Sequence, residues 1–368
     1  MLAVFLDFQR AFETIDRSIL LRKLERYGIR GVELAWFASF LKGRTQLVKI
    51  GKVKSRPLAN ELGVPQGSIL GVLLFLLYIN DISDCLEFCD IKMFADDTLI
   101  YMKTIDVNEG VIKLNSDLSK LFDKINQNKL KLNVEKTKMI VVSKKKNLIK
   151  ENIVVNIDGK RIVVEDRMKY LGVIIDENMS FKPNFENVCA KMARKVGVLA
   201  RIGNQLNLQQ KIMVYKTIIE PHICYCATVL FLNSDSDLER LQRIQNKCIR
   251  TIFKLDKYTS KEMLLQVSGL FSVKQTVEFN TLVAVHKIVH KLWPSYLSSR
   301  IKHKSENETK NKLRSKNEIE KTNTLKSYSQ NSIFYKGIEL YNKLTKELKT
   351  ESNIGKFKNG LKKCIVNM

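Results

Sequence analysis

The sequence predicts an α+β fold followed by an all-helical region. Short apolar runs of strand type alternate with helical patterns over about 180 residues, and apolar residues at three- and four-residue steps then dominate from about residue 184 to residue 293. Of the 368 residues, 45% are hydrophobic and 27% are charged, which is ordinary for a globular protein and excludes global disorder. A chain of this length has room for two or three domains.

The first part opens with a strand and a helix. Residues 1–6 form a short apolar run of strand type that ends on Asp7. Apolar residues from Phe12 to Tyr27 recur at three- and four-residue steps. We therefore expect a helix there, with Gly28 as its C-terminal cap.

A hairpin and a buried helix are expected next. The runs on either side of Gly51-Lys52, within residues 45–58, predict two antiparallel strands joined by a tight turn. Ser68 follows a turn-rich loop, and its hydroxyl is placed to cap a buried helix that runs to about Ser83.

A second hairpin carries two adjacent carboxylates. Apolar runs at residues 91–94 and 98–102 lie on either side of Ala95-Asp96-Asp97, which places both aspartates at the tip of the hairpin. The other elements expected in this part are an amphipathic helix and four strands, at residues 107–128, 138–142, 153–157, 161–164 and 170–175.

The end of the chain is polar and basic. A segment rich in Lys, Asn, Ser and Glu predicts a flexible basic linker over residues 301–332. Apolar residues at helical spacing return in 334–348, so we expect a short helical tail over residues 333–368. Lys and Arg outnumber Asp and Glu by 16 to 7 between residues 301 and 368, so this tail adds to the positive charge.

The net charge of +25 points to a partner rich in negative charge, either nucleic acid or an anionic membrane. The longest apolar run, residues 69–79, is far shorter than the ~20 residues that span a bilayer. Residues 1–6 are too few for the core of a signal peptide, and Asp7 follows at once. We therefore expect an intracellular protein, nuclear or cytoplasmic and not secreted, that binds nucleic acid and no membrane.

The cysteines and two histidines suggest no metal site. The 7 cysteines lack the spacing of a zinc knuckle or ribbon, so we expect reduced and mostly buried thiols. His286 and His290 would share a helix face, but no third ligand lies near them in the sequence. We interpret both as ordinary helix residues.

Asp7, Asp96 and Asp97 carry the chemistry that the sequence suggests. Each lies at the end of an apolar run, where a carboxylate costs folding energy unless something pairs with it. Adjacent carboxylates repel each other, and a third brought alongside increases the repulsion. Mg²⁺ would relieve all three, because it takes carboxylate oxygens and keeps positions for substrate phosphates. The alternative is that Asp96-Asp97 is only a polar turn, in which Asp is common.

Five segments carry a resemblance to a known family. They are, in chain order, Phe5-Leu6-Asp7-Phe8-Gln9-Arg10-Ala11-Phe12, Gly63-Val64-Pro65-Gln66-Gly67-Ser68, Phe94-Ala95-Asp96-Asp97, Leu132-Asn133-Val134-Glu135-Lys136-Thr137 and Tyr170-Leu171-Gly172-Val173. Their order and spacing resemble the palm motifs and the primer-grip element of reverse transcriptases. The residues are most similar to those of jockey-like retrotransposons without long terminal repeats. The segment 215–222 also resembles the thumb-side region of such elements.

The resemblance implies a right-hand polymerase palm, in which an antiparallel sheet packs on helices, followed by an all-helical thumb-like region. The implied domains are a palm with primer grip, a thumb-like region, a flexible basic linker and a short helical basic tail, at residues 1–180, 181–300, 301–332 and 333–368. The implied reaction is RNA-templated addition of deoxynucleotides to a primer 3′-hydroxyl with two Mg²⁺ ions, or with Mn²⁺ as an alternative. The implied partners are an RNA template, a DNA primer and dNTPs.

The resemblance also assigns roles around the metals. It makes Asp7 and Asp96 the firmer metal ligands and catalytic residues, with Asp97 in support. It gives the backbone carbonyl of Phe8 to the second metal. The implied primer-grip residues are Tyr170, Leu171 and Gly172.

Further roles concern the nucleotide. Phe12 matches the residue that stacks under the incoming sugar and collides with a ribose 2′-hydroxyl, and its alternative is a core position on the apolar face of its helix. Gln66 and Gly67 match the loop beside the nascent base pair, where Gly67 permits close approach of the backbone. Lys136 matches a lysine that protonates the leaving pyrophosphate, and its alternative is a solvated lysine.

Two basic stripes recur at helical spacing downstream, and their alternative is an ordinary solvated helix face. We interpret them as phosphate contacts because the whole chain is so basic. The residues are Lys191, Arg194, Lys195, Arg201, Arg240, Arg243, Lys247 and Arg250.

The chain opens directly at the first of these motifs. We therefore expect a truncated copy without the upstream endonuclease domain and fingers, and a weak or inactive enzyme, because losing an oriented substrate costs many powers of ten in rate. One alternative is a non-catalytic nucleic-acid-binding remnant. Another is an RNA-dependent RNA polymerase or a maturase-like protein. Phe12 argues against the RNA polymerase, and no intron-binding domain is recognisable.

Overall fold

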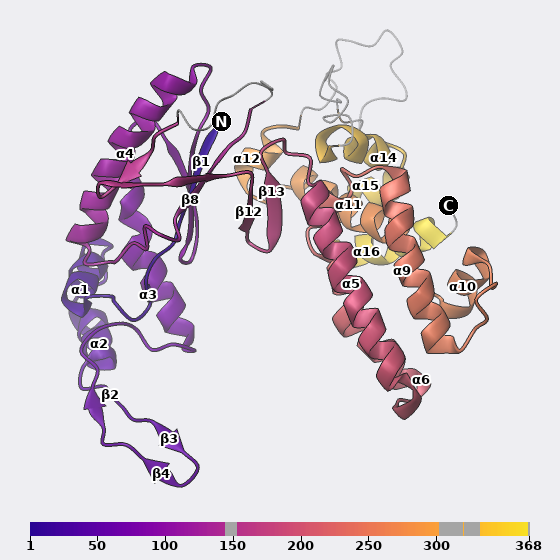
Figure 1. Cartoon of the computed structure of the whole chain (residues 1–368), viewed down its shortest axis with the longest axis horizontal. Helices are drawn as coiled ribbons and strands as arrows, with labels where there is room; N and C mark the ends of the chain where they lie inside the picture. Colours follow the sequence, from indigo (N-terminus) through magenta and orange to yellow (C-terminus); the bar gives the residue numbers. More distant parts are fainter. Residues whose placement is uncertain (144–152, 302–318, 320–331, 367–368) are drawn as a thin grey trace. The chain divides into compact units, whose positions relative to one another are not determined.

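The computed structural model describes residues 1–143, 153–301, 319 and 332–366, and it divides into two compact units, Met1–Ser180 and Phe181–Met368. The expected order of a mixed sheet-and-helix part followed by helices is confirmed (Figure 1). Nearly all of the expected linker, residues 301–332, lies outside the described residues.

A five-stranded sheet in the order β11-β8-β1-β7-β6 forms the centre of the first unit. All its neighbouring strands are antiparallel except β11 and β8, which are parallel. The strands are β1 (Leu2–Leu6), β6 (Asp90–Phe94), β7 (Asp97–Met102), β8 (Lys138–Val141) and β11 (Val163–Glu165). Smaller strands pair in hairpins, namely β2 (Thr45–Gln46), β3 (Lys49–Ile50), β4 (Val53–Lys54), β5 (Leu58–Ala59), β9 (Asn156–Ile157), β10 (Lys160–Arg161), β12 (Arg167–Tyr170) and β13 (Val173–Asp176).

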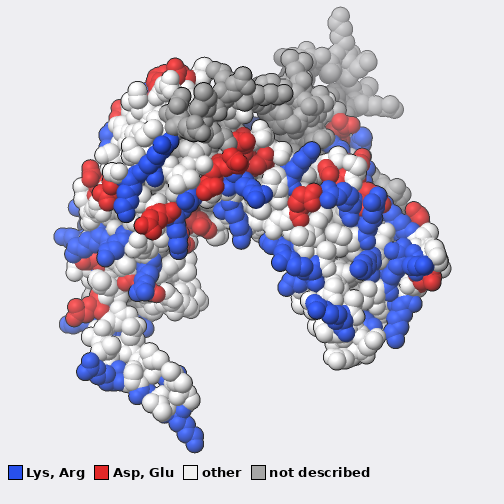
Figure 2. Space-filling view, viewed as in Figure 1, with Lys and Arg blue, Asp and Glu red and all other residues white. Residues whose placement is uncertain are grey.

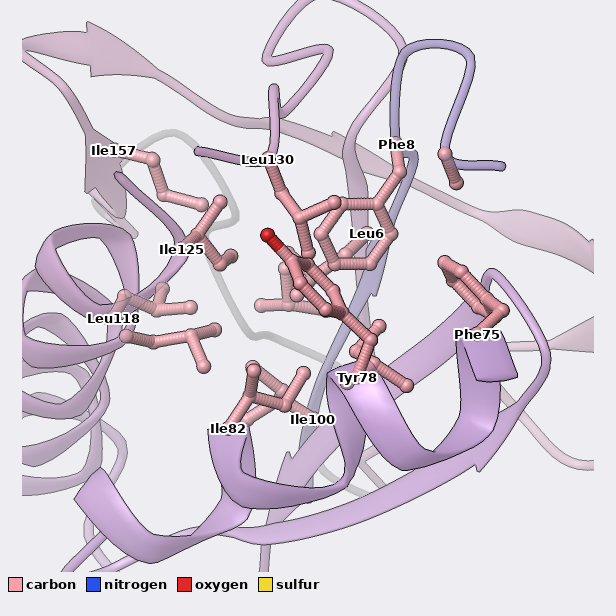
Figure 3. Close-up of a cluster of buried hydrophobic side chains, with 14 of the residues drawn as sticks. Leu6, Phe8, Phe75, Tyr78, Ile82, Ile100, Leu118, Ile125, Leu130 and Ile157 are labelled. Carbon is pink, nitrogen blue, oxygen red and sulfur yellow. The ribbon is translucent and has the colours of Figure 1, made fainter. Parts of the chain in front are cut away.

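Helices pack on one face of this sheet (Figure 1). They are α1 (Arg17–Arg26), α3 (Ile69–Ile79), the 3₁₀ helix η1 (Asn80–Cys85) and α4 (Val107–Gln127), and α2 (Gly31–Leu41) packs on α1. Alternate residues of β1 contribute to the shared core with the buried faces of α3 and α4, as Leu6, Tyr78 and Leu118 show in Figure 3. The core also fixes a polar contact, because the Tyr78 hydroxyl, wholly buried, donates to the Asn128 carbonyl at 2.5 Å.

Three expectations about the first unit need correction. The helix expected from Phe12 begins only at Arg17, because the Asp16 carboxylate caps it by accepting from the Ile19 N–H at 2.9 Å. Helix α2 was not predicted. The single strand expected over 170–175 is a hairpin, whose turn is Leu171-Gly172.

Other expectations about this unit are confirmed. Residues 45–59 form a hairpin, with β2 on β5 and β3 on β4. The Ser68 hydroxyl accepts from the Gly71 N–H at 2.9 Å and caps α3. The strand expected over 153–157 is confirmed only in part, because the strand of the structure is limited to Asn156–Ile157.

The second unit is helical. Its long helices are α5 (Lys182–Ile202), α9 (Asp235–Phe253) and α11 (Val273–Val289), which share one apolar core. Helices α14 (Ile338–Asn342) and α16 (Ile354–Val366) pack on α11 around a second core. The other elements are η3 (Gly203–Gln205), α6 (Leu208–Val214), the π-helices η4 (Tyr215–Ile219) and η6 (Ile333–Gly337), α7 (Pro221–Cys224), α8 (Ala227–Leu230), α10 (Lys261–Ser268), α12 (Ser295–Ser298) and α15 (Lys346–Thr350).

Candidate active site

Strand pairing brings the three aspartates together. Strand β1 pairs with β7 so that Leu6 lies opposite Thr98, and the next residues outward, Asp7 and Asp97, are therefore neighbours across the sheet. Phe94 lies opposite Asp97 in the β6–β7 hairpin, which leaves Ala95-Asp96 as a two-residue turn. Residues 89 or 90 positions apart in the chain thus share one end of the sheet.

The two-residue period of the strands decides which face carries the carboxylates. Leu2, Val4 and Leu6 face the helices, whereas Ala3 and Phe5 face the other side of the sheet. Asp7 continues the second set, because side chains alternate along a strand. By the same alternation Asp97 shares a face with Leu99 and Tyr101. Both carboxylates therefore leave the sheet on the face opposite the helices.

The electrostatics of the site agree with this placement. Burial, followed by the charges of Asp96 and Asp7, raises the pKa of the Asp97 carboxyl. Burial and then the Asp97 charge raise the pKa of the Tyr170 phenol. The Tyr170 ring packs edge-on against Phe5, with the ring centroids 5.5 Å apart. The hairpin β12–β13 therefore places the expected primer grip beside the carboxylates.

The carboxylate oxygens of the three aspartates suit Mg²⁺ in a partly open site. Asp96 and Asp97 are exposed and Asp7 is half-buried, so their oxygens are accessible. No three His, Cys, Asp or Glu side chains of the described residues gather into a closed metal cage. Mg²⁺ does not need one, because it is commonly held by one or two carboxylates together with substrate phosphates and water.

The backbone beside Asp7 is fixed by the segment that contains Lys136. The Asn133 N–H donates to the Asp7 carbonyl at 2.7 Å, and the Gln9 N–H donates to the Lys131 carbonyl at 2.8 Å. These two bonds flank Phe8 and direct its own carbonyl away from this segment, which leaves that oxygen without a described donor. A metal ligand at Phe8 is compatible with this geometry.

Lys136 lies on the same segment but its side chain is exposed. Its backbone N–H donates to the Asn133 side chain at 3.3 Å, while its ammonium makes no ion pair with another part of the described structure. Both interpretations of Lys136, as proton donor and as solvated lysine, are compatible with this position.

Phe12 lies in the turn before α1 and not on a helix. Its ring is half-buried against Phe75, with the centroids 4.5 Å apart. The Val64 N–H donates to the Phe12 carbonyl at 3.0 Å, which ties this turn to the loop that carries Gln66 and Gly67. One face of the ring is thus used for packing, and the remainder is available to a ligand.

Gln66 and Gly67 are exposed at the rim of this turn. The Gln66 amide donates to the Glu13 carboxylate at 3.1 Å, so this loop and the Phe12 turn are joined by side chains as well as by backbone. Arg17 holds the start of the same loop by donating to the carbonyls of Asn60, Leu62 and Gly63 at 2.6, 2.9 and 3.0 Å. Nothing in the local sequence marks Arg17 for this positioning role, because its partners lie 43 to 46 residues away.

The predicted basic stripes lie on α5 and α9 of the second unit, and their members differ. Arg240 is bound to the Glu186 carboxylate through two contacts of 2.8 and 3.1 Å, and Arg250 donates to the Thr259 carbonyl at 2.9 Å. These two side chains are used within the protein. The exposed side chains of the two stripes are those of Arg240 itself and of Arg194, Lys195, Arg201, Arg243 and Lys247, with Lys191 half-exposed.

The two histidines have structural surroundings. The His286 ring is buried, stacks on Phe357 and lies 3.0 Å from the Tyr341 hydroxyl through Nδ1. His290 contacts the Lys349 carbonyl at 3.0 Å. Both side chains hold the C-terminal helices against α11.

Comparison with known proteins finds similarity to polymerases over the first unit. Residues 1–175 match the family model described as reverse transcriptase (RNA-dependent DNA polymerase). The sheet that presents the aspartates lies within these matched residues.

Its curated relatives are transposon proteins. The chain is 27% identical to the RNA-directed DNA polymerase from mobile element jockey of Drosophila melanogaster over 67% of its own length and 28% of that protein. It is 24% identical to the probable RNA-directed DNA polymerase from transposon BS of the same species, over 76% of the chain and 32% of the relative. The expected relationship to jockey-like elements is confirmed. The chain spans less than a third of the length of either relative.

A solved structure shows a more distant likeness. Telomerase from Candida albicans, in complex with the TWJ fragment of telomeric RNA, is 11% identical, with a TM-score of 0.38 over 73% of this chain and 50% of that one. The assignment to reverse transcriptases rests on the sequence relatives. No helix in the described part of the chain is long and apolar enough to cross a membrane.

Proposed function

We propose that this chain contributes the catalytic palm of an RNA-directed DNA polymerase, which extends a DNA primer on an RNA template. The observation that carries the proposal is the convergence of Asp7, Asp96 and Asp97 at one end of the sheet, where burial and then the charges of Asp96 and Asp7 raise the pKa of the Asp97 carboxyl. Two Mg²⁺ ions, or Mn²⁺ in their place, would activate the primer 3′-hydroxyl and stabilise the leaving pyrophosphate.

The residues of the chain have separate tasks in this reaction. Asp7 and Asp96 hold the metals, Asp97 supports them, and the Phe8 carbonyl is directed to be a further oxygen ligand. Phe12 presents the exposed part of its ring to the sugar and excludes a 2′-hydroxyl. These contacts place the reacting groups and stabilise charge, which is where most of the acceleration of phosphoryl transfer arises.

Other residues position the strands and the leaving group. Gln66 and Gly67 border the nascent base pair, and Lys136 donates a proton to pyrophosphate. Tyr170 and the turn Leu171-Gly172 hold the primer end beside the carboxylates. The exposed cations of α5 and α9 bind phosphates of the template and primer.

Primer extension with a matched charge control tests this proposal. The double variant Asp96→Asn/Asp97→Asn removes two carboxylates from the site, and Asp84→Asn/Asp90→Asn removes two exposed carboxylates outside it. We expect the site variant to lose Mn²⁺ binding, measured by electron paramagnetic resonance, and any extension of a DNA primer on RNA with Mg²⁺ and dNTPs. The control variant should keep both.

Two results would count against a catalytic palm. Mn²⁺ binding or extension that survives in the site variant would refute the assignment of the carboxylates. Salt-sensitive RNA binding that is equal in all three proteins, with no extension and no bound Mn²⁺, would instead identify the non-catalytic nucleic-acid-binding remnant.

A further inference from the structure

The hairpin β2–β5 leaves the first unit as a thin ribbon with no core of its own. Every residue from 42 to 59 is exposed, and Figure 1 shows the ribbon extending away from α2. Each half of the ribbon contains only two paired residues per strand. A two-stranded ribbon of this kind is marginally stable in water, so a bound partner would favour its formation.

The charge of this hairpin has one sign. Between Glu33 and Glu61 the chain holds no acidic residue. No ion pair joins any of the hairpin cations to another described residue, and Figure 2 shows blue without red along the visible face of the ribbon. The cations are Lys42, Arg44, Lys49, Lys52, Lys54 and Arg56.

Two of these cations oppose each other. Lys49 lies directly across from Lys54 in the β3–β4 register. Like charges at directly opposed positions destabilise a pair of strands. The hairpin therefore contains a repulsion that an anion lying along the ribbon would relieve.

The apolar side chains of the ribbon are also turned to solvent. Ile50 and Val53, opposite each other, are 77% and 75% exposed, and Val48 is 64% exposed. Apolar groups beside cations suit a ligand that carries both charge and apolar surface, which a nucleic-acid strand provides through its phosphates and its sugars and bases.

The base of the hairpin opens into a polar cavity. It has a volume of about 460 Å³ and extends from Arg44 and Gln46 to Glu13 and Gln66. That volume lies within the range of ligand pockets. Its far end adjoins the turn that carries Phe12, so a strand lying on the hairpin has a continuous path to the proposed nucleotide site.

We propose that the hairpin, together with Arg44 and the cavity at its base, binds the unpaired RNA template strand ahead of the active site. The choice of template strand rests on the proposed function, because the palm carboxylates and the loop of Gln66 define where the copied base lies. The main contacts are to the backbone, since phosphates are the groups that a row of exposed cations neutralises.

The test compares two variants with equal loss of charge. The hairpin variant is Lys49→Gln/Lys52→Gln/Lys54→Gln/Arg56→Gln, and all four of its positions are exposed. Circular dichroism and thermal melting check that it is folded. Fluorescence anisotropy then measures binding to a primer–template with a 5′ RNA overhang, in EDTA and without dNTPs, over a range of salt concentrations.

The control variant is Arg22→Gln/Arg26→Gln/Lys103→Gln/Lys160→Gln, which removes four exposed charges elsewhere in the same unit. Four lost phosphate contacts should reduce the salt slope of log K by about 2.8, since a single strand contributes about 0.7 per contact. We expect the hairpin variant to bind the overhang at least about tenfold more weakly at 0.1 M salt. The affinity of the control variant should stay within about twofold of the wild-type affinity, because salt screens charges that do not contact the RNA.

Three outcomes would overturn the proposal. Equal losses in the two variants would show that only the total charge matters. An equal loss on a blunt duplex would show that the hairpin does not bind the unpaired strand. A hairpin-dependent interaction with vesicles of anionic phospholipid, without one with RNA, would assign the hairpin to a membrane surface. Because no metal or dNTP is present, these results are independent of whether Asp96→Asn/Asp97→Asn abolishes Mn²⁺ binding.

Discussion

Replacing Gly63 by alanine should disturb the contact between the Phe12 turn and the loop of the second motif. Gly63 has φ +74°, and a Cβ atom built on it lies 2.7 Å from the Phe12 carbonyl oxygen and 2.8 Å from the Glu13 Cα. Both obstacles are backbone atoms, so no flexible side chain can move aside. Gly67 provides the matched comparison, because it has φ +77° but nothing within 4 Å of its Cβ position.

The expected loss of stability has two parts, backbone strain and steric overlap. A left-handed conformation costs an L-residue about 1–2 kcal/mol, and this cost applies to both positions. Inserting an atom into close-packed surroundings costs about 1–3 kcal/mol more, and this cost applies only to Gly63. We therefore expect Gly63→Ala to lower the free energy of unfolding by about 2–5 kcal/mol and Gly67→Ala by about 1–2 kcal/mol.

Hydrogen exchange with mass spectrometry is the assay, because it separates peptides of the first unit from those of the second. Amide protection should fall most in the peptides that contain the Phe12 turn and the loop after Gly63, and it should not change in the helical unit. Equal destabilisation by the two substitutions would refute the close approach of these backbones. A larger effect of Gly67→Ala would do so as well.

Three further predictions concern packing, pH and charge. Tyr78→Phe should lower the free energy of unfolding by about 1–3 kcal/mol in a urea titration, because it leaves the buried Asn128 carbonyl without its donor, and a smaller loss would show that water replaces the hydroxyl. Burial lowers the pKa of His286 to about 4, so the unfolded state takes up the proton first, and stability should fall by about 3 kcal/mol as the pH drops from about 6.5 to 4. Thermal melts of His286→Phe should lack that fall, and an unchanged pH profile would contradict the assignment. Because Arg240 is held by an acidic partner, Arg240→Gln should change RNA affinity by less than about twofold, whereas Arg243→Gln should remove a full phosphate contact. Filter binding at two salt concentrations measures both variants, and a larger loss of affinity for Arg240→Gln would contradict this prediction.

The sequence by itself predicted several local elements and the residue types of the proposed site. The apolar runs on either side of Ala95-Asp96-Asp97 predicted the β6–β7 hairpin and placed Asp96 and Asp97 at its tip, and the structure narrows the turn to Ala95-Asp96. Ser68 capped α3 as expected, since a cap depends on residues within one turn of helix. These features depend on neighbours in the chain, and propensity and spacing are sufficient to predict them.

Contacts between distant segments were decided by the tertiary structure. The strand register puts Asp7 beside Asp97, and it is the packing of alternate β1 residues against the helices that selects this register. The helix expected from Phe12 begins later, because the Phe12 carbonyl accepts from the Val64 N–H in the loop and Asp16 caps the helix. The apolar periodicity of a sequence indicates which residues share a helix face, but it carries no information about hydrogen bonds to distant segments.

Contacts between distant segments also decide the roles of residues that look alike in the sequence. Arg240 and Arg243 have equal helical spacing to other cations, yet Arg240 meets Glu186 from a neighbouring helix, while Arg243 makes no ion pair with a described residue. Arg17 looks like an ordinary helix residue until its three carbonyl partners, more than 40 positions away, come within hydrogen-bonding distance. Sequence fixes which groups can ionise or donate, whereas the packing of distant elements fixes which partners they meet.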